Sequence, residues 1–195
     1  MTQSTPLPFP DSEHDTPVFP APVQELEVQF AEEFTNLQGK FVFCMNVQEL
    51  IARLSDLIAH ERWNQVFCSE PALLQILPPA EIPVDSSLAL KDADVSLTTC
   101  ECLVARTGTI VLSAAQQQGR TASLYAPVHI CIAFTNQLVY DVKDAFIMMR
   151  HKYPGRLPSL ITFASGPSRT ADIEKTLVVG VHGPKEVYLF LVEQH

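Results

Sequence analysis

The stretch S-G-P-S-R-T-A-D-I-E-K-T-L-V-V-G-V-H-G-P, from Ser165 to Pro184, decides how the end of this chain is expected to fold. On one side of it lies the apolar run Leu160–Ala164, and on the other lies the run Glu186–Val192. Short apolar runs bounded by glycine and proline are typical of buried strands. The stretch therefore predicts a strand, a glycine-proline loop, a short helix, a second turn and a closing strand.

The loop that follows the first of these strands has the features of an anion site. Gly166 and the proline after it turn the backbone sharply and leave peptide N–H groups uncommitted. Ser168 or Thr170 is expected to cap the next helix, whose N-terminus attracts phosphate or carboxylate, and Arg169 adds a planar guanidinium. Acidic residues such as Glu174 in the first turns would instead satisfy the helix dipole themselves. The alternative is a capped turn with Arg169 in a structural ion pair.

The rest of the chain alternates between helical and strand patterns. Helices are expected over Gln24–Gln38, Asn46–Glu61 (with Asn46 as its cap and Glu49 as capping-box partner), Glu70–Leu77 and Asp141–Tyr153. Strands are expected over Lys40–Met45, Gln65–Cys68, Val95–Thr98, Thr109–Leu112, Val128–Phe134 and Gln137–Tyr140, with the last beside the one before it. This alternation predicts an α/β fold with a mostly parallel, three-layer sheet. Ligands of such sheets lie beyond the carboxyl ends of the strands, where both glycine motifs are expected.

Length and composition suit one α/β domain preceded by an extended arm. The chain has 195 residues, of which 47% are hydrophobic, enough for a sizeable core. Residues 1–24 hold six prolines and three acidic residues, so no helix or packed sheet is expected there. The arm is expected to be disordered or to lie across a neighbouring subunit in a homo-dimer. Residues 25–195 are expected to form the single domain.

Charge and cysteine content exclude several classes of partner. With 13 basic and 22 acidic residues the net charge is −9, which disfavours nucleic acid and anionic membrane surfaces. No run of 18 apolar residues predicts a membrane span. Five cysteines, an odd number behind an N-terminus unlike a secretory signal, predict buried reduced thiols in a cytoplasmic protein. They lack the spacing of metal or iron–sulfur ligands.

Few residues stand out as candidates for chemistry. Thr107-Gly108-Thr109 leads into a strand and would add hydroxyl and N–H donors to the pocket of the loop. His182 lies between glycines, so it is either a general base with substrate within reach or a turn histidine bonded to its own backbone. Glu101 is the acid nearest to the threonine-glycine motif. His129 alternates with apolar neighbours and is expected to be a hydrogen-bonded core residue.

Three segments resemble the LUD-domain family, in particular its lactate-utilisation protein C branch. They are G-P-S-R-T-A-D-I-E (Gly166–Glu174) with G-V-H-G-P (Gly180–Pro184), R-T-G-T-I-V-L-S (Arg106–Ser113) and G-R-T-A-S-L-Y-A-P-V-H-I (Gly119–Ile130). The resemblance covers Asp94–Leu191 well and the first half of the chain loosely. It implies the α/β fold of the NagB/RpiA/CoA-transferase type, shared by sugar-phosphate isomerases, CoA transferases and folate cyclo-ligases.

The resemblance also bears on two arginines. It implies that Arg120, in an otherwise polar connection, is a second contact for an anion. Arg106 departs from the family pattern, in which an acidic residue is expected just before the threonine-glycine motif. The reversed charge puts any acid or base role at that point in doubt, and Glu101 would replace it only if the backbone brought it close.

The function implied by the resemblance is that of an accessory, non-redox subunit of a cytoplasmic L-lactate oxidation system, which converts lactate to pyruvate. Iron–sulfur subunits would be its partners, and this chain would carry no cofactor of its own. Its loop would bind a small carboxylate or phosphate, or a partner. The alternatives are a stand-alone enzyme for a phosphorylated, acyl or folate-type substrate, with Glu101, Glu174 or His182 as the reacting group, and a ligand-sensing module without catalysis.

Overall fold

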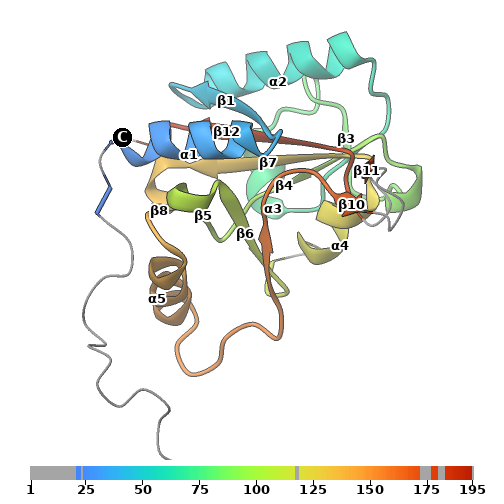
Figure 1. Ribbon diagram of the computed structural model, residues 1–195. Coiled ribbons are helices and arrows are strands. Elements are labelled where there is room, and N and C mark those ends of the chain that lie inside the picture. Colours follow the sequence, from blue (N-terminus) through green and yellow to red (C-terminus); the bar gives the residue numbers. More distant parts are fainter. Residues whose placement is uncertain (1–20, 23, 117–118, 172–176, 180–182, 195) are drawn as a thin grey trace, which may run out of the picture.

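The computed structural model describes residues 21–22, 24–116, 119–171, 177–179 and 183–194, and the predicted arm lies almost entirely outside them (Figure 1). The centre of the described part is a parallel six-stranded sheet in the order β1-β12-β7-β4-β2-β3. Its strands are β1 (Lys40–Cys44), β2 (Val66–Phe67), β3 (Val84–Asp85), β4 (Val95–Thr98), β7 (Val128–Phe134) and β12 (Glu186–Val192). The predicted α/β class with a mostly parallel sheet is confirmed.

One face of this sheet is covered by α2 (Val47–Glu61) and α3 (Pro71–Ile76). Helix α2 begins as predicted, because the Asn46 side chain accepts a hydrogen bond of 2.9 Å from the backbone N–H of Glu49. The Glu49 carboxylate accepts from the N–H of Met45 at 2.7 Å, one residue before the position that a capping box would use. The helix start is therefore satisfied by its own local sequence.

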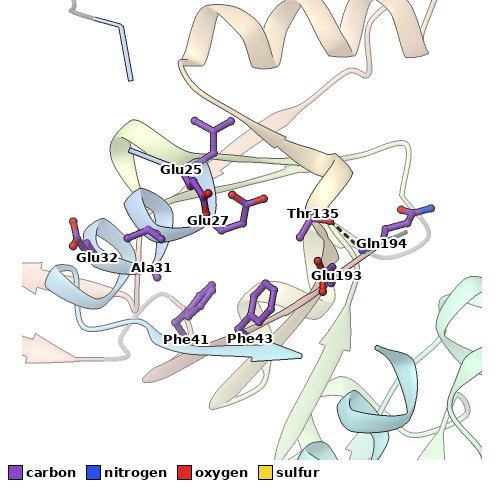
Figure 2. A pocket seen from close by; sticks show the side chains of 11 residues that line it. Glu25, Glu27, Ala31, Glu32, Phe41, Phe43, Thr135, Glu193 and Gln194 are labelled. Atoms are coloured by element: carbon purple, nitrogen blue, oxygen red, sulfur yellow. Dashed lines mark hydrogen bonds between the residues drawn. The ribbon is translucent and has the colours of Figure 1, made fainter. Parts of the chain in front are cut away.

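The other face is covered by α1 (Leu26–Asn36) and by a second, four-stranded sheet in the order β8-β5-β6-β9. The strands of this smaller sheet are β5 (Cys102–Val104), β6 (Thr109–Ser113), β8 (Leu138–Val139) and β9 (Ile161–Ala164). Helix α5 (Val142–Lys152) packs on its far side (Figure 1). Helix α1 and the edge strand β1 also flank a groove (Figure 2).

Short elements complete the described chain. They are α4 (Gly119–Tyr125), the 3₁₀ turns at Leu90–Asp92, Ala105–Thr107 and Thr135–Gln137, and the strands β10 (Arg169–Ala171) and β11 (Leu177–Val179). β10 and β11 pair antiparallel with each other, with Arg169 opposite Val179. The sequence predicted a helix starting at Ser168 or Thr170, and this prediction is wrong. The segment has β-branched residues in register across the hairpin, which favours strands.

Two other strand assignments need correction. β8 does not return beside β7, because it pairs parallel with β5 in the smaller sheet. β9 is an edge strand of that same sheet and is only half-buried, with Phe163 37% exposed. An apolar run predicts burial but does not identify the sheet that the strand joins. The strands β3 and β5 were not predicted from the sequence.

The core contains the polar and sulfur groups that the sequence placed there. All five cysteines are free and buried, and burial raises the pKa of Cys44 and Cys68 to about 11. His129 is 2% exposed, and its Nε2 lies 2.8 Å from Oγ1 of Thr98 on the neighbouring strand. Burial lowers the pKa of His129 to about 4. His129 is therefore a neutral, hydrogen-bonded core residue, as predicted.

Candidate functional site

The threonine-glycine motif and the start of the 165–184 loop lie side by side. β6 pairs antiparallel with β9, with Ile110 opposite Ala164, so the residues just beyond this pair meet. Oγ1 of Thr109 lies 2.7 Å from Oγ of Ser165 and 2.8 Å from Oγ1 of Thr107. These three hydroxyls form the hydroxyl cluster. The structure thus brings together two motifs that the sequence expected to share a pocket.

The two glycines beside the hydroxyl cluster make room for helix α1. Gly108 has φ +55°, and a Cβ on it would lie 2.5 Å from the backbone nitrogen of Phe34. Gly166 has φ +77°, and a Cβ there would lie 2.5 Å from the carbonyl oxygen of Leu37. Both a left-handed backbone and a close approach of chain segments require glycine. Helix packing is therefore a sufficient reason for both glycines, without a ligand.

The loop lies at the amino ends of the parallel strands. The N–H of Ser168 donates to the carbonyl of Pro184 at 2.9 Å, and the N–H of Lys185 donates to the carbonyl of Pro127 at 2.8 Å. Pro127 and Lys185 come directly before β7 and β12. The expectation that the loop would stand at the carboxyl ends is therefore wrong, since the loop precedes β12 in a sheet whose strands all run the same way.

The structure describes some of the other predicted ligand contacts and leaves the rest outside the described residues. Around the loop, a Cβ on Gly183 would lie 3.0 Å from Cβ of Ser168 and 3.9 Å from Cδ2 of Leu124, so α4 packs against this region. Arg120 is in α4, and Arg169 and Thr170 are in β10. The candidates His182 and Glu174 lie outside the described residues. The role of these residues in ligand binding stays a prediction.

Arg106, which departs from the family pattern, has a structural partner. Its Nε donates to Oδ2 of Asp141 at 2.8 Å, and its backbone N–H donates to the carbonyl of Tyr140 at 3.1 Å. Burial raises the pKa of Asp141, but the hydrogen bond and charge of Arg106 outweigh this and leave that pKa lowered. Asp141 also caps α5 through the N–H of Lys143. Arg106 thus ties the 3₁₀ turn before β6 to the start of α5.

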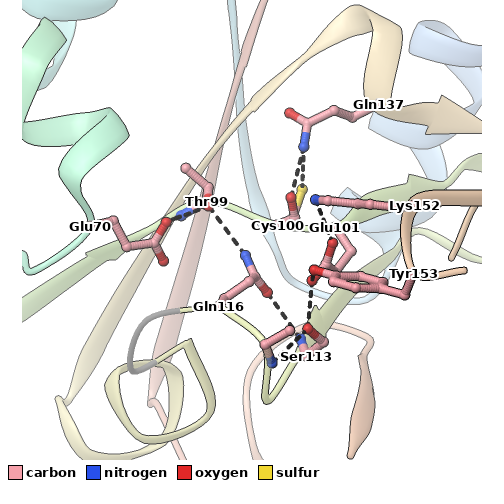
Figure 3. A network of polar contacts seen from close by, with 10 residues as sticks. Glu70, Thr99, Cys100, Glu101, Ser113, Gln116, Gln137, Lys152 and Tyr153 are labelled. Carbon is pink, nitrogen blue, oxygen red and sulfur yellow. Dashed lines mark hydrogen bonds and ion pairs between the residues drawn. The ribbon is translucent and has the colours of Figure 1, made fainter. Parts of the chain in front are cut away.

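A second cluster of polar side chains, centred on Glu101, lies at the carboxyl ends of the parallel strands (Figure 3). Glu101 follows β4, and its side chain is 0% exposed. Its carboxylate accepts hydrogen bonds from Oγ of Ser113 at 2.5 Å, from Nζ of Lys152 at 2.7 Å and from the hydroxyl of Tyr153 at 2.9 Å. These partners come from the end of β6 and the end of α5. Three distant segments therefore converge on one buried carboxylate.

Glu70, which follows β2, is the second carboxylate of this group. It is 6% exposed, and its Oε2 accepts hydrogen bonds from the backbone N–H of Thr99 at 3.1 Å and from the Thr99 hydroxyl. Its Oε1 is buried and has no hydrogen-bond partner among the described residues. Burial raises the pKa of Glu70, and the negative charge of Glu101 adds to this, although the bonds from Thr99 oppose it. A buried oxygen without a hydrogen bond costs free energy, and such atoms are rare in folded proteins.

Gln116 links the two carboxylates into one array (Figure 3). Its Nε2 lies 3.2 Å from Oγ1 of Thr99, and its Oε1 accepts from the N–H of Ser113 at 2.9 Å. We call Glu70, Thr99, Glu101, Ser113, Gln116, Lys152 and Tyr153 the carboxylate network. Ser113 and Thr109 lie at opposite ends of β6, which separates the network from the hydroxyl cluster by about 13 Å.

The sequence identified only part of the carboxylate network. Glu101 was a candidate because it precedes the threonine-glycine motif, but its partners Lys152 and Tyr153 come from 51 and 52 residues away. Glu70 was assigned only to the start of a helix, and it does precede α3 as its N-cap residue, without a side-chain cap bond. Its position directly after a buried strand was the available signal. A titratable group with a shifted pKa at this edge is a candidate for acid–base work.

Comparison with known proteins places these features in a family. Residues 79–192 match the LUD domain, and the chain belongs to the LUD domain family. That match includes the hydroxyl cluster and all of the carboxylate network except Glu70. A protein named Lactate utilization protein C from Shouchella clausii is 41% identical over 102 residues, which are 52% of this chain and 44% of that protein. This chain thus spans about half the length of that relative.

A relative and a crystal structure from Deinococcus radiodurans are similar over more of the chain. A relative named Lactate utilization protein C is 30% identical over 184 residues, which are 89% of this chain and 83% of the relative. A crystal structure described as a DUF162 family protein from the same organism superposes with a TM-score of 0.63 at 23% identity. It covers 86% of this chain and 96% of that one, and supports the fold.

The described residues contain neither a helix able to span a membrane nor a cluster of potential metal ligands. In that part of the chain, no helix combines the length and the hydrophobicity that crossing a bilayer requires. Nor do three or more His, Cys, Asp or Glu side chains within it gather closely enough to hold a metal ion.

Proposed function

We propose that this chain serves lactate utilisation as an accessory, non-redox subunit whose iron–sulfur partners carry out the electron transfer from lactate. The observation that carries the proposal is the Deinococcus radiodurans relative named Lactate utilization protein C, because the alignment covers 89% of this chain and 83% of the relative. The five buried cysteines fit a chain that packs its thiols into the core. In this proposal, the electron transfer from lactate takes place in the other subunits.

Co-purification from cells of the source organism grown on lactate tests the subunit role. The tagged chain should recover cysteine-rich iron–sulfur proteins in near-stoichiometric amount, and cells without the gene should lose growth on lactate but not on glucose. Re-expression of the chain should restore growth. Recovery of the chain alone, together with normal growth of the deletion strain on lactate, would contradict the role.

The proposed ligand of the 165–184 loop is a small carboxylate or phosphate. Support comes from the hydroxyl cluster beside Gly166 and from the packing of α4 against Ser168 and Gly183 at the same end of the sheet. Hydroxyls and a guanidinium are donors that suit an anion. Arg169 is proposed as the charged contact, and Thr170, Arg120 and His182 are proposed as further contacts.

The substitution Arg169→Ala tests this ligand. Titration calorimetry with L-lactate and with inorganic phosphate should show affinity lowered at least about tenfold, as expected for loss of a charge-assisted contact. Arg156→Ala is the matched control, because Arg156 is exposed in the loop after α5 and its removal changes the net charge equally. Equal affinity of the two variants would contradict a role for Arg169. Thermal unfolding should be the same for both.

A second candidate function is acid–base catalysis by a stand-alone enzyme at the carboxylate network. The observation that favours it is the buried Oε1 of Glu70, which has no hydrogen-bond partner among the described residues, together with a pKa that burial raises, the direction expected of a carboxyl group in acid–base catalysis. A substrate hydroxyl or amide would provide the absent hydrogen-bond donor. Screening of phosphorylated, acyl and folate-type substrates should then find a turnover that Glu70→Gln removes while the protein stays folded. Retention of that turnover in Glu70→Gln would exclude the carboxylate network as the site of acid–base catalysis by Glu70.

A further inference from the structure

A groove of about 840 Å³ lies between helix α1 and the edge strand β1, and none of its described lining residues belongs to the hydroxyl cluster or the carboxylate network (Figure 2). Its walls are the first half of α1 on one side and β1 on the other. It ends at Thr135, Glu193 and Gln194, which follow β7 and β12. A volume of this size is in the range of sites that hold a ligand or a peptide segment.

The floor of the groove is apolar. Phe41 and Phe43 are two residues apart on β1, so their rings point to the same face, and Figure 2 shows them next to each other below α1. Both pack against the core but are only partly buried. Val28, on the α1 wall, is 47% exposed. The groove therefore offers an aromatic surface that aliphatic carbon atoms, such as the stem of a long side chain, would cover.

The rim of the groove is acidic. Glu25, Glu27, Glu32 and Glu193 line it, and no lysine or arginine is among the described lining residues. The basic residue nearest along the chain, Lys40 at the start of β1, is engaged with Glu186 at 2.5 Å and with the hydroxyl of Tyr188 at 2.7 Å. Charges of one sign around a concave surface focus the field within it. The groove thus attracts cationic groups.

The wall formed by β1 is also an open sheet edge. Among the described strands, β1 pairs only with β12, so the six-stranded sheet ends at Lys40–Cys44. The outer edge of such a strand presents backbone N–H and C=O groups to a further strand. An extended peptide that adds to an edge gains main-chain hydrogen bonds, and its alternate side chains fill the pockets beside it.

We infer that this groove binds an extended segment of a partner protein in which lysine or arginine alternates with apolar residues, added along β1 as a further strand. Because side chains of a strand alternate between its two faces, the lysine or arginine side chains would point toward α1, with their aliphatic stems over Phe41 and Phe43 and their charges at the glutamates. The apolar side chains would lie on the opposite face, beside Val42. A second copy of this chain fits poorly, since its net charge is −9. The chain's own residues 1–24 fit poorly as well, because they contain three acidic residues and no lysine or arginine. This inference stands independently of the role in lactate utilisation.

Fluorescence anisotropy with the full chain and a labelled ten-residue peptide of alternating lysine and valine tests the charge match. The variant E25Q/E27Q/E32Q should bind this peptide about tenfold more weakly than the native chain, and added salt should reduce the difference. The control D56N/E81Q/D92N removes three exposed carboxylates outside the groove and should change the affinity less than about twofold. Equal weakening in both variants would overturn the inference.

Hydrogen exchange tests the strand addition. The bound peptide should slow exchange of the amides of Lys40–Cys44 and leave those of α2 unchanged. Protection elsewhere without protection of β1, or equal binding of a peptide of alternating glutamate and valine, would overturn the inference. Sedimentation adds a further check. A dimer of the native chain that E25Q/E27Q/E32Q dissociates would assign the groove to a second copy and overturn the peptide partner.

Discussion

The two ends of the six-stranded sheet differ in the kind of polar group that they hold. At the amino ends, the loop residues and the threonine-glycine motif contribute hydroxyls, backbone groups and glycines that pack against α1. At the carboxyl ends, Glu70 and Glu101 are buried carboxylates in one hydrogen-bonded network. The 165–184 loop and the two buried carboxylates are thus at opposite ends of the sheet. A strong sequence motif marks a family, but it does not by itself locate the buried titratable groups of a sheet.

The largest effect is expected at the carboxyl end, on substitution of Glu101. Glu101→Ala removes three hydrogen bonds to a buried carboxylate and leaves the buried hydroxyl of Ser113 without its acceptor, so it should lower the free energy of unfolding by about 3 to 5 kcal/mol. Urea denaturation at pH 7 measures this. The comparison variant is Glu186→Ala, whose pair with Lys40 is half-exposed and should be worth at most about 1 kcal/mol. Similar losses in the two variants would show that the network is no more important than a surface ion pair.

A smaller effect is expected from His129, a titratable group held neutral between the two ends. Its pKa falls from 6.5 to about 4 on folding, so the unfolded chain binds more protons between these pH values. Its contribution to stability is present above pH 6.5 and is lost as the pH falls to about 4, on the order of 3 kcal/mol. In His129→Gln, which keeps a partner for Thr98, this part of the pH dependence should be absent. Parallel stability curves for the two proteins from pH 4 to 7 would contradict it.

At the amino end, glycine substitutions separate helix packing from backbone strain. Gly108→Ala should lower the free energy of unfolding by about 2 kcal/mol, because the left-handed backbone is strained and the new Cβ meets the backbone of Phe34. Gly155→Ala is the matched control, since its φ is +87° but no described atom lies within 4 Å of its Cβ position. It should cost about 1 kcal/mol. Equal losses of stability in the two variants, measured by thermal unfolding, would mean that α1 shifts with little loss of free energy to make room for the new Cβ.

The smallest effect is expected for Glu70→Gln, and it has the opposite sign. Burial raises the pKa of Glu70 above 4.5, so the folded state loses stability as the pH rises through the folded pKa. The variant removes this penalty and should be more stable than the native chain at pH 7, with no advantage below pH 4.5. Denaturation at pH 4 and pH 7 measures the difference. A variant that is less stable at pH 7 would show that the carboxylate has an ionic partner.

Local sequence predicted most of the elements, because their signals lie within a few residues. Helix α2 follows from its cap at Asn46 and from the spacing of its apolar residues, and β7 and β12 follow from runs that are apolar on both faces. His129 was identified as a core residue from its neighbours alone. The family segments were also readable without a structure, because their residues are contiguous.

The segments with which these elements pair or pack were decided only by the tertiary structure. The sheet that β9 joins, the β10–β11 hairpin in place of a helix, and the end of the sheet at which the loop stands all depend on pairing between distant segments. The same holds for the carboxylate network, which joins residues from Glu70 to Tyr153, and for the groove between α1 and β1. Periodicity and capping are properties of neighbouring residues, whereas the burial and pKa of a carboxylate depend on groups that folding brings to it.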